Sequence, residues 1–233
     1  MKLQKETISN DESRSANRHG KWYEDACGTA FALELVGERW SLLIVRELMF
    51  GGRRFSDLRS GLPGISAKVL TERLESLEAA GIVRRRQLPP PVSAQVYELT
   101  EWGYGAETAI KELGRWAATS PDHDPTLPLS PASLMLSFRT MFDGERAGGL
   151  KAKGAVRIGK ERFFVKVAKG RLKAERGELD NPDFTIAAPV ASLIAGMVYG
   201  KAAPADLPGV EVSGDARKLA AYVDCFHLPA KAG

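Results

Sequence analysis

Residues 54–86 read RFSDLRSGLPGISAKVLTERLESLEAAGIVRRR, and this stretch decides the fold of the first half of the chain. We expect a short helix near residues 54–60, because Phe55 and Leu58 have the three-residue spacing of one buried helical face. The proline and glycines within residues 61–65 then predict a turn.

A longer helix should follow this turn. Ser66 is a favourable N-cap, and the helix is expected to run to about Ala80 and to stop at Gly81. Its buried stripe consists of leucines at helical spacing: Leu70, Leu74 and Leu77. Its opposite face is polar and carries Lys68, Thr71, Glu72 and Glu75. The stretch therefore predicts two helices joined by a turn, the second of which exposes a polar face.

A basic hairpin is expected next. Residues 82–88 and 92–99 read as two strands, and the proline run 89–91 lies in the tip between them. Successive side chains of a strand point to opposite faces, so at most two of the three arginines at 84–86 share one face.

The two helices and the hairpin together suit duplex DNA. The major groove admits one α-helix, whose side chains can contact the base edges, and a preceding helix holds that helix in place. The hairpin, or wing, can bring arginines to phosphates or to the minor groove. Residues 53–86 hold eight basic against four acidic side chains, which suits a polyanion-binding face. A solvated charged surface would give the same pattern.

Flanking segments complete a mostly helical domain. Residues 30–35 predict a short helix that ends at Gly37, and residues 40–49 are apolar over nearly the full circumference expected of a central core helix. Thr100 should cap a single final helix that reaches Trp116.

The order and spacing of these motifs resemble those of HxlR-type regulators. The shared blocks are Cys27, Leu35-Val-Gly-Glu-Arg-Trp40, Arg46-Glu-Leu48, Arg54-Phe-Ser-Asp-Leu58, Gly64-Ile-Ser66, Lys68-Val-Leu-Thr-Glu-Arg-Leu74, Leu77-Glu-Ala-Ala-Gly-Ile-Val83, Val96-Tyr-Glu-Leu-Thr100 and Gly103. The resemblance spans roughly residues 24–118. It implies a winged helix-turn-helix transcriptional regulator that binds double-stranded DNA as a homodimer, with the first and last helices of the domain making most of the dimer contact. The wing tip at residues 89–94 departs from the family pattern.

Eight side chains are candidate DNA contacts on this interpretation: Arg54, Ser66, Lys68, Thr71, Arg73, Arg84, Arg85 and Arg86. Lys68 and Thr71 are expected on the exposed face of the second helix, where an ordinary solvated surface is the alternative. Arg73 flanks the buried stripe and has two interpretations, a DNA contact or an ion pair with a neighbouring acid. Arg54 is placed to meet the DNA backbone.

Cys27 is a candidate redox residue, because the resemblance to HxlR-type regulators implies a cysteine at this position, through which some members of that family sense oxidants or electrophiles. No lysine or arginine stands beside it in the sequence to lower its pKa, and Asp25 would oppose such a shift. The interpretation preferred from the residues is a quiet, partly buried cysteine. Cys225 is far away in the sequence, so the two cysteines do not form a disulfide framework.

Composition and length indicate two globular domains. Of the 233 residues 44% are hydrophobic and 27% charged, and no apolar run approaches the roughly 20 residues that span a bilayer. We expect a disordered polar tail at residues 1–20, the winged helix at 21–118, a proline-rich linker at 119–130 and a second domain at 131–233. The polar start lacks the apolar core of a secretory signal, and a cytoplasmic location without membrane attachment is expected.

The second domain is expected to be α+β. Helical patterns at 131–143, from Pro189 to Gly200, and after Asp215 accompany strand patterns. These strands are expected at 155–158, 162–168, 171–176, 184–186 and 210–212, and a small antiparallel sheet is the predicted arrangement.

This order resembles the sterol-carrier-protein-like fold, through Asn181-Pro-Asp-Phe-Thr-Ile186, Leu193-Ile-Ala-Gly-Met-Val-Tyr-Gly200 and Val210-Glu-Val-Ser-Gly-Asp215. The resemblance covers roughly residues 131–228 and implies a cavity for a small hydrophobic ligand between sheet and helices. The candidate lining residues are Phe163, Phe184, Leu193, Met197 and Phe226. The same residues could instead fill a compact core.

Enzyme classes find little support in the sequence. His19, His123 and His227 have no metal-ligand spacing, and neither a phosphate-binding glycine loop nor a nucleophile elbow occurs. We therefore expect no catalytic residues, metal or cofactor. The alternative to a ligand-modulated, DNA-binding regulator is a carrier or scaffold for hydrophobic molecules, in which the winged helix serves mainly for dimerisation.

Overall fold

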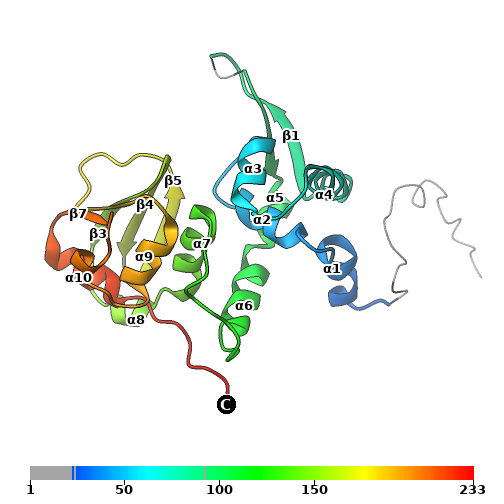
Figure 1. Ribbon diagram of the computed structural model, residues 1–233. Coiled ribbons are helices and arrows are strands. Elements are labelled where there is room, and N and C mark those ends of the chain that lie inside the picture. Colours follow the sequence, from blue (N-terminus) through cyan, green and yellow to red (C-terminus); the bar gives the residue numbers. More distant parts are fainter. Residues whose placement is uncertain (1–22, 24, 92) are drawn as a thin grey trace, which may run out of the picture.

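The computed structural model describes residues 23, 25–91 and 93–233, and it shows a helical half with a protruding hairpin beside a half built on a sheet (Figure 1). The expected polar tail at residues 1–20 lies outside the described residues. Within the described part of the chain no helix is long and apolar enough to span a membrane.

The first half has the winged helix-turn-helix arrangement that the sequence predicts. Its elements are α1 (Gly28–Val36), α2 (Ser41–Leu48), α3 (Phe55–Gly61), α4 (Ala67–Ala79), β1 (Val83–Gln87), β2 (Gln95–Leu99), α5 (Glu101–Gly105) and α6 (Glu107–Ala117). Ser66 caps α4, because its Oγ accepts a hydrogen bond from the Val69 N–H at 3.2 Å. The predicted leucine stripe of α4 is buried, at Leu70, Leu74 and Leu77.

The segment after the wing differs from the expected single helix. Thr100 does cap a helix, since its Oγ1 accepts from the Gly103 N–H at 3.0 Å, but this helix ends after five residues and α6 begins at Glu107. Two glycines within α5 lower its helix propensity. Gly103 is required at its place, because a Cβ there would lie 2.2 Å from the Ile82 carbonyl oxygen.

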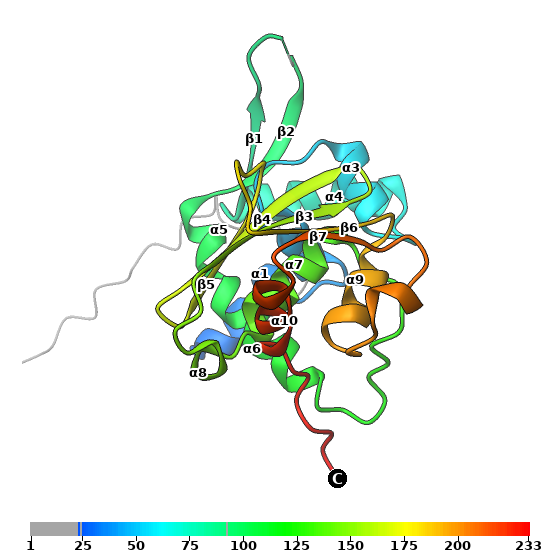
Figure 2. The ribbon, with the colours of Figure 1, turned by 90° about the vertical axis from the view of Figure 1, so that its left-hand side faces the viewer.

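The second half consists of a five-stranded sheet with helices. Its elements are α7 (Pro131–Met141), α8 (Gly144–Ala147), β3 (Ala152–Ile158), β4 (Glu161–Ala168), β5 (Arg171–Arg176), β6 (Phe184–Ala188), α9 (Ala191–Val198), the 3-10 helix η2 (Pro204–Asp206), β7 (Glu211–Gly214) and α10 (Ala216–Asp224). Helices α7, α9 and α10 lie on one side of the sheet (Figure 2). Asp215 caps α10 as expected, accepting from the N–H groups of Arg217 and Lys218.

The expectation of an antiparallel sheet is wrong for one pair of strands. The strand order is β5-β4-β3-β6-β7, and β3 pairs with β6 in parallel, with Gly154 opposite Phe184. The sheet is therefore mixed, because the chain leaves the β5 edge and returns to the far side of β3. The absence of a side chain at Gly154 leaves room for the Phe184 ring, which a Cβ would meet at 2.3 Å. Helix α9 also begins at Ala191, two residues after the expected Pro189.

The two halves pack directly against each other. Helix α7 contacts both α2 and α6, and the Ser130 hydroxyl donates to Glu47 Oε1 at 2.6 Å. The Phe50 and Phe163 rings meet edge to face, with centroids 5.6 Å apart. Most of the buried apolar residues of both halves belong to one continuous cluster, so the sheet half and the helix-turn-helix share a core.

Candidate nucleic-acid interface

The outward face of α4 carries the side chains expected to meet DNA. The Lys68 side chain is 87% exposed, and its ammonium lies 3.9 Å from the Glu72 carboxylate one turn later. Thr71 is exposed on the same helix. An exposed pair at this distance is weak, so Lys68 can exchange its partner for a phosphate or a base edge at little cost.

The beginning of each helix of the motif is also exposed. Arg54 is the N-cap residue of α3 and its side chain is exposed. Ser66 is exposed at the start of α4, but its hydroxyl is already engaged as the cap. The helix N-termini carry partial positive charge that favours phosphate.

Arg73 points away from this face. Its guanidinium lies 3.3 Å from the Glu38 carboxylate, and its side chain is only 15% exposed. The structure therefore shows the ion pair that is one of the two interpretations of this residue. It joins α4 to the segment between α1 and α2, so its role here is to brace the recognition helix.

The three wing arginines divide as the strand geometry requires. Arg84 and Arg86 both reach Glu98 on the partner strand, with closest distances of 2.7 and 2.8 Å. Arg85 turns to the other side, where it pairs with Glu78 at 2.9 Å and covers the Tyr97 ring. Two cations share one carboxylate, so the Arg84–Arg86 face keeps a positive charge while both side chains remain more than half exposed.

Cys27 is exposed, so the expectation of partial burial is wrong. It is the N-cap residue of α1. Hydrogen bonds from the backbone N–H groups of Ala30 and Thr29, and from the Thr29 side chain, lower the pKa of the Cys27 thiol. No basic neighbour in the sequence indicates this shift, but the place of Cys27 at the N-terminus of a helix does.

Four of the five residues expected to line a ligand cavity in the second domain are buried in the core of the sheet half. Phe163, Phe184, Met197 and Phe226 are at most 3% exposed and pack in the core. Leu193 alone among these five borders a large cavity, and this cavity lies between the two halves. No local sequence pattern indicates this cavity, because its walls come from segments that are far apart in the chain.

A family model described as the HxlR-like helix-turn-helix matches residues 35–124. Among curated proteins, YvaP of Bacillus subtilis (strain 168), an uncharacterized HTH-type transcriptional regulator, is 37% identical over 86 residues, which cover 37% of this chain and 80% of that protein. The HTH-type transcriptional regulator YodB of the same organism is 41% identical over 86 residues, covering 37% and 77%. The solved reduced form of YodB shows 36% identity and a TM-score of 0.39, and it covers 43% of this chain and 100% of that one. The sheet half lies outside the residues that the family model matches.

Proposed function

This chain belongs to the HxlR-like helix-turn-helix family of transcriptional regulators, and from that premise we propose that it recognises a specific duplex sequence as a homodimer through α4 and the wing. The observation that carries the proposal is the exposed polar face of α4, where Lys68 makes, among the described residues, only a long surface ion pair and Thr71 is open to solvent. Strand β1 packs against α4, so the arginines of the wing approach the same duplex as the recognition helix.

We assign each candidate contact to the bases or to the DNA backbone from the surroundings of its side chain. Lys68 and Thr71 are assigned to base edges and adjacent phosphates. Arg54 and the Arg84–Arg86 face are assigned to the DNA backbone, since flexible exposed cations attract phosphate without selecting a sequence. Arg73 is left out of the contact set because Glu38 holds it.

Dimerisation is proposed through α1 and α6. Neither helix buries a residue in the single chain, although Leu33 of α1 is 49% exposed and Trp116 of α6 is 73% exposed. Large apolar side chains exposed on two helices of one domain are typical of an interface. Both helices lie at the end of the domain away from the wing tip (Figure 1), so a second copy bound there would leave the wing free for DNA.

The sheet half is proposed to be sterol-carrier-like and to modulate DNA binding through an apolar ligand. Its mixed sheet with helices on one side supports the sterol-carrier-like fold, and the direct packing of α7 on α2 and α6 supports the modulation of DNA binding.

A carrier function, with the winged helix used mainly for dimerisation, is the second candidate. It draws on the same cavity between the halves. A regulator of this kind acts in the cytoplasm and needs neither a cofactor nor a catalytic residue.

The decisive experiment is the selection of duplexes from a random-sequence pool by the full chain. A regulator enriches one motif with two related half-sites about one helical turn, or a multiple of it, apart. Its affinity for that motif should fall steeply with salt, because phosphate contacts release counterions. Sedimentation of the protein, alone and with the selected duplex, gives the number of copies bound. A protein that enriches no motif and binds DNA only weakly at every salt concentration would support the carrier instead.

A further inference from the structure

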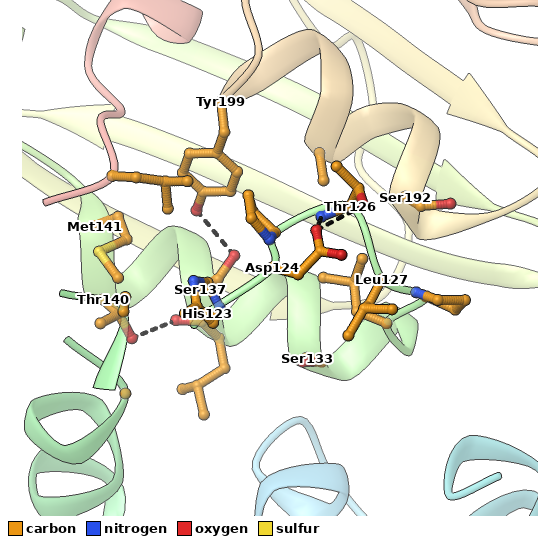
Figure 3. A pocket seen from close by; sticks show the side chains of 18 of the residues that line it. His123, Asp124, Thr126, Leu127, Ser133, Ser137, Thr140, Met141, Ser192 and Tyr199 are labelled. Atoms are coloured by element: carbon orange, nitrogen blue, oxygen red, sulfur yellow. Dashed lines mark hydrogen bonds between the residues drawn. The ribbon is translucent and has the colours of Figure 1, made fainter. Parts of the chain in front are cut away.

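A cavity of about 950 Å³ lies between the helix-turn-helix and the sheet half. Its walls come from α2 and α6 on one side and from α7 and α9 on the other, and the connecting segment 123–129 runs across it (Figure 3). This volume falls at the upper end of the range for small-molecule sites. Because both halves contribute, an occupant would contact the two halves at once.

Most of the cavity lining is apolar. Leucine and isoleucine side chains from four helices supply it, namely Leu42, Leu43, Ile110, Leu113, Leu136 and Leu193. Leu43 and Leu113 are 38% and 49% exposed in the single chain, so these apolar side chains face solvent when nothing fills the space. Covering them stabilises a complex through the hydrophobic effect.

Two of the polar side chains in this lining form a hydrogen-bonded pair between α7 and the end of α9. The Tyr199 and Ser137 hydroxyl oxygens lie 2.8 Å apart (Figure 3), and the Ser137 hydroxyl donates to the Leu134 carbonyl at 2.8 Å. Ser137 has one proton, so it accepts from Tyr199, and both hydroxyl protons are then used. Burial raises the pKa of Tyr199, which keeps the phenol neutral. At this place in the cavity the pair therefore offers lone pairs, which match a hydrogen-bond donor on the occupant.

The charged residues of the lining do not select an ion. Arg46 pairs with Glu47 at 2.9 Å, and the Asp124 carboxylate accepts from the backbone and the hydroxyl of Thr126 at 2.8 and 2.6 Å. His123 and Asp124 are both exposed. A charged ligand would leave its charge against apolar walls, where desolvation is costly.

We propose that this cavity between the halves is an effector site for a neutral, mainly apolar molecule that carries one hydroxyl or N–H group. The regulatory part of this inference rests on the proposed function. The site is distinct from the core of the sheet half, where the sequence predicts a cavity, and it has walls that belong to the DNA-binding half.

The connecting segment gives the occupant a route to the DNA-binding half. The Lys231 ammonium donates to the carbonyls of Ala118, Ser120 and His123 at 3.2, 2.8 and 2.9 Å, which ties the end of α6 and the first residue of the connecting segment to the same side chain. A ligand that fits best against one position of this segment stabilises that position, together with the matching placement of α2 and α6. Only such a difference in affinity between two arrangements can change DNA binding.

The test uses N-phenyl-1-naphthylamine, a neutral fluorescent probe with apolar rings and one N–H group. The full chain should bind it at one saturable site per chain with increased emission. Leu43→Trp and Leu193→Trp fill the cavity from its two opposite halves, and each should weaken binding at least tenfold. Val212→Trp places the same side chain on an exposed position outside the lining and should bind the probe as the native chain does. Circular dichroism and melting curves confirm that each variant folds.

The polar pair gives a second measurement. Tyr199→Phe removes the accepting phenol oxygen and should weaken probe binding about fivefold, the factor that one ordinary hydrogen bond supplies. Equal affinity in the native chain, Leu43→Trp and Leu193→Trp would overturn the site, because the probe would then bind elsewhere. Saturation at one probe per two chains would assign the space to a dimer interface and would also overturn it.

DNA binding separates the failure of this inference from that of the proposed function. With the selected duplex, saturating probe should change the affinity of the native chain by at least threefold and leave that of Leu193→Trp unchanged. An unchanged native affinity would overturn the regulatory role. If the native chain selects a duplex but binds no probe, the inference alone fails. If it binds the probe but selects no duplex, the regulatory role fails together with the proposed function, and the ligand-binding site stands.

Discussion

Arg53 and Glu161 join the two halves of the molecule, with Arg53 Nη1 2.5 Å from Glu161 Oε1 although the residues are 108 positions apart. Arg53 lies two residues before the start of α3, and Glu161 is the first residue of β4. The other oxygen of the same carboxylate meets Arg176, whose Nε donates to the Phe50 carbonyl at 3.1 Å. Burial and the neighbouring Arg53 lower the pKa of Arg176 to about 10. One carboxylate therefore compensates two guanidinium groups at this interface.

Glu161→Gln should lower the free energy of unfolding by about 3 kcal/mol, because two largely buried arginines would lose their shared counter-charge. Urea unfolding of the full chain, followed by far-UV circular dichroism, measures this change. Glu178→Gln is the matched control, since Glu178 forms one exposed pair with Arg162 at 3.6 Å and its loss should cost less than about 1 kcal/mol. Equal effects of the two substitutions would show that the interface does not depend on Glu161.

Replacing Lys68 and Thr71 together by alanine should weaken binding to the selected duplex by about 1–3 kcal/mol for each base edge that the variant no longer reads. The fold should be unaffected, because the Lys68–Glu72 pair is exposed and long. Lys151→Ala, at an exposed position just before β3, is the control for the removal of one positive charge. Gel-shift titrations against the selected duplex and a scrambled one give both affinity and specificity. Native behaviour of the double variant would remove these residues from the recognition face.

Arg84→Gln with Arg86→Gln should flatten the salt dependence of DNA binding by about one unit of slope for each phosphate that is no longer neutralised. Glutamine removes the charge but keeps a donor for the buried Glu98 carboxylate, which loses both counter-charges, so circular dichroism is used to confirm that the wing stays folded. Arg85→Gln is the contrast, because Arg85 is held by Glu78 on the other side of the strand. We expect the slope to change little in that variant. A larger effect of Arg85→Gln than of the double variant would reverse the assignment of the two wing faces.

Helix starts in both halves of the molecule can be predicted because their sequence signals are local. The sequence predicts Ser66, Thr100 and Asp215 as caps, and each caps a helix, since a cap depends on the next three residues alone. The sequence leaves the partner of Arg73 open, because Glu38 lies on a different element. The parallel pairing of β3 with β6 also depends on the path of the whole chain, whereas the alternation of buried residues along a strand is the same in either direction.

The thiol of Cys27 should react with a maleimide at lower pH than the thiol of glutathione does. The lowered pKa means that a larger fraction is thiolate at any pH below the ordinary thiol range, and the thiolate is the reactive form. Cys225 is buried and burial raises its pKa, so the folded chain should take up one label. Mass spectrometry over a pH series gives the rate at each cysteine.

Thr29→Val tests the cause of this shift, because it removes the hydroxyl bond to the thiol and keeps the backbone donors. The rate profile of Cys27 should move toward higher pH, without reaching that of glutathione. A profile in the native chain at or above that of glutathione would contradict the role of the helix N-terminus.

Tyr222→Phe should leave the free energy of unfolding unchanged or raise it by up to about 1 kcal/mol. Tyr222 is fully buried against the Phe138, Phe184 and Phe226 rings, and its hydroxyl has no hydrogen-bond partner among the described residues. Removing a desolvated hydroxyl that makes no bond keeps the ring packing and ends the cost of burying that group.

Tyr199→Phe provides the comparison, because this hydroxyl does have a partner in Ser137. Its loss should lower the free energy of unfolding by about 1 kcal/mol. Urea unfolding of both variants beside the native chain therefore measures the same chemical change in two neighbouring phenols with opposite expected signs. If Tyr222→Phe were the more destabilised of the two, the Tyr222 hydroxyl would have to be bonded in solution, and the aromatic core beside the cavity would then contain an ordered polar group.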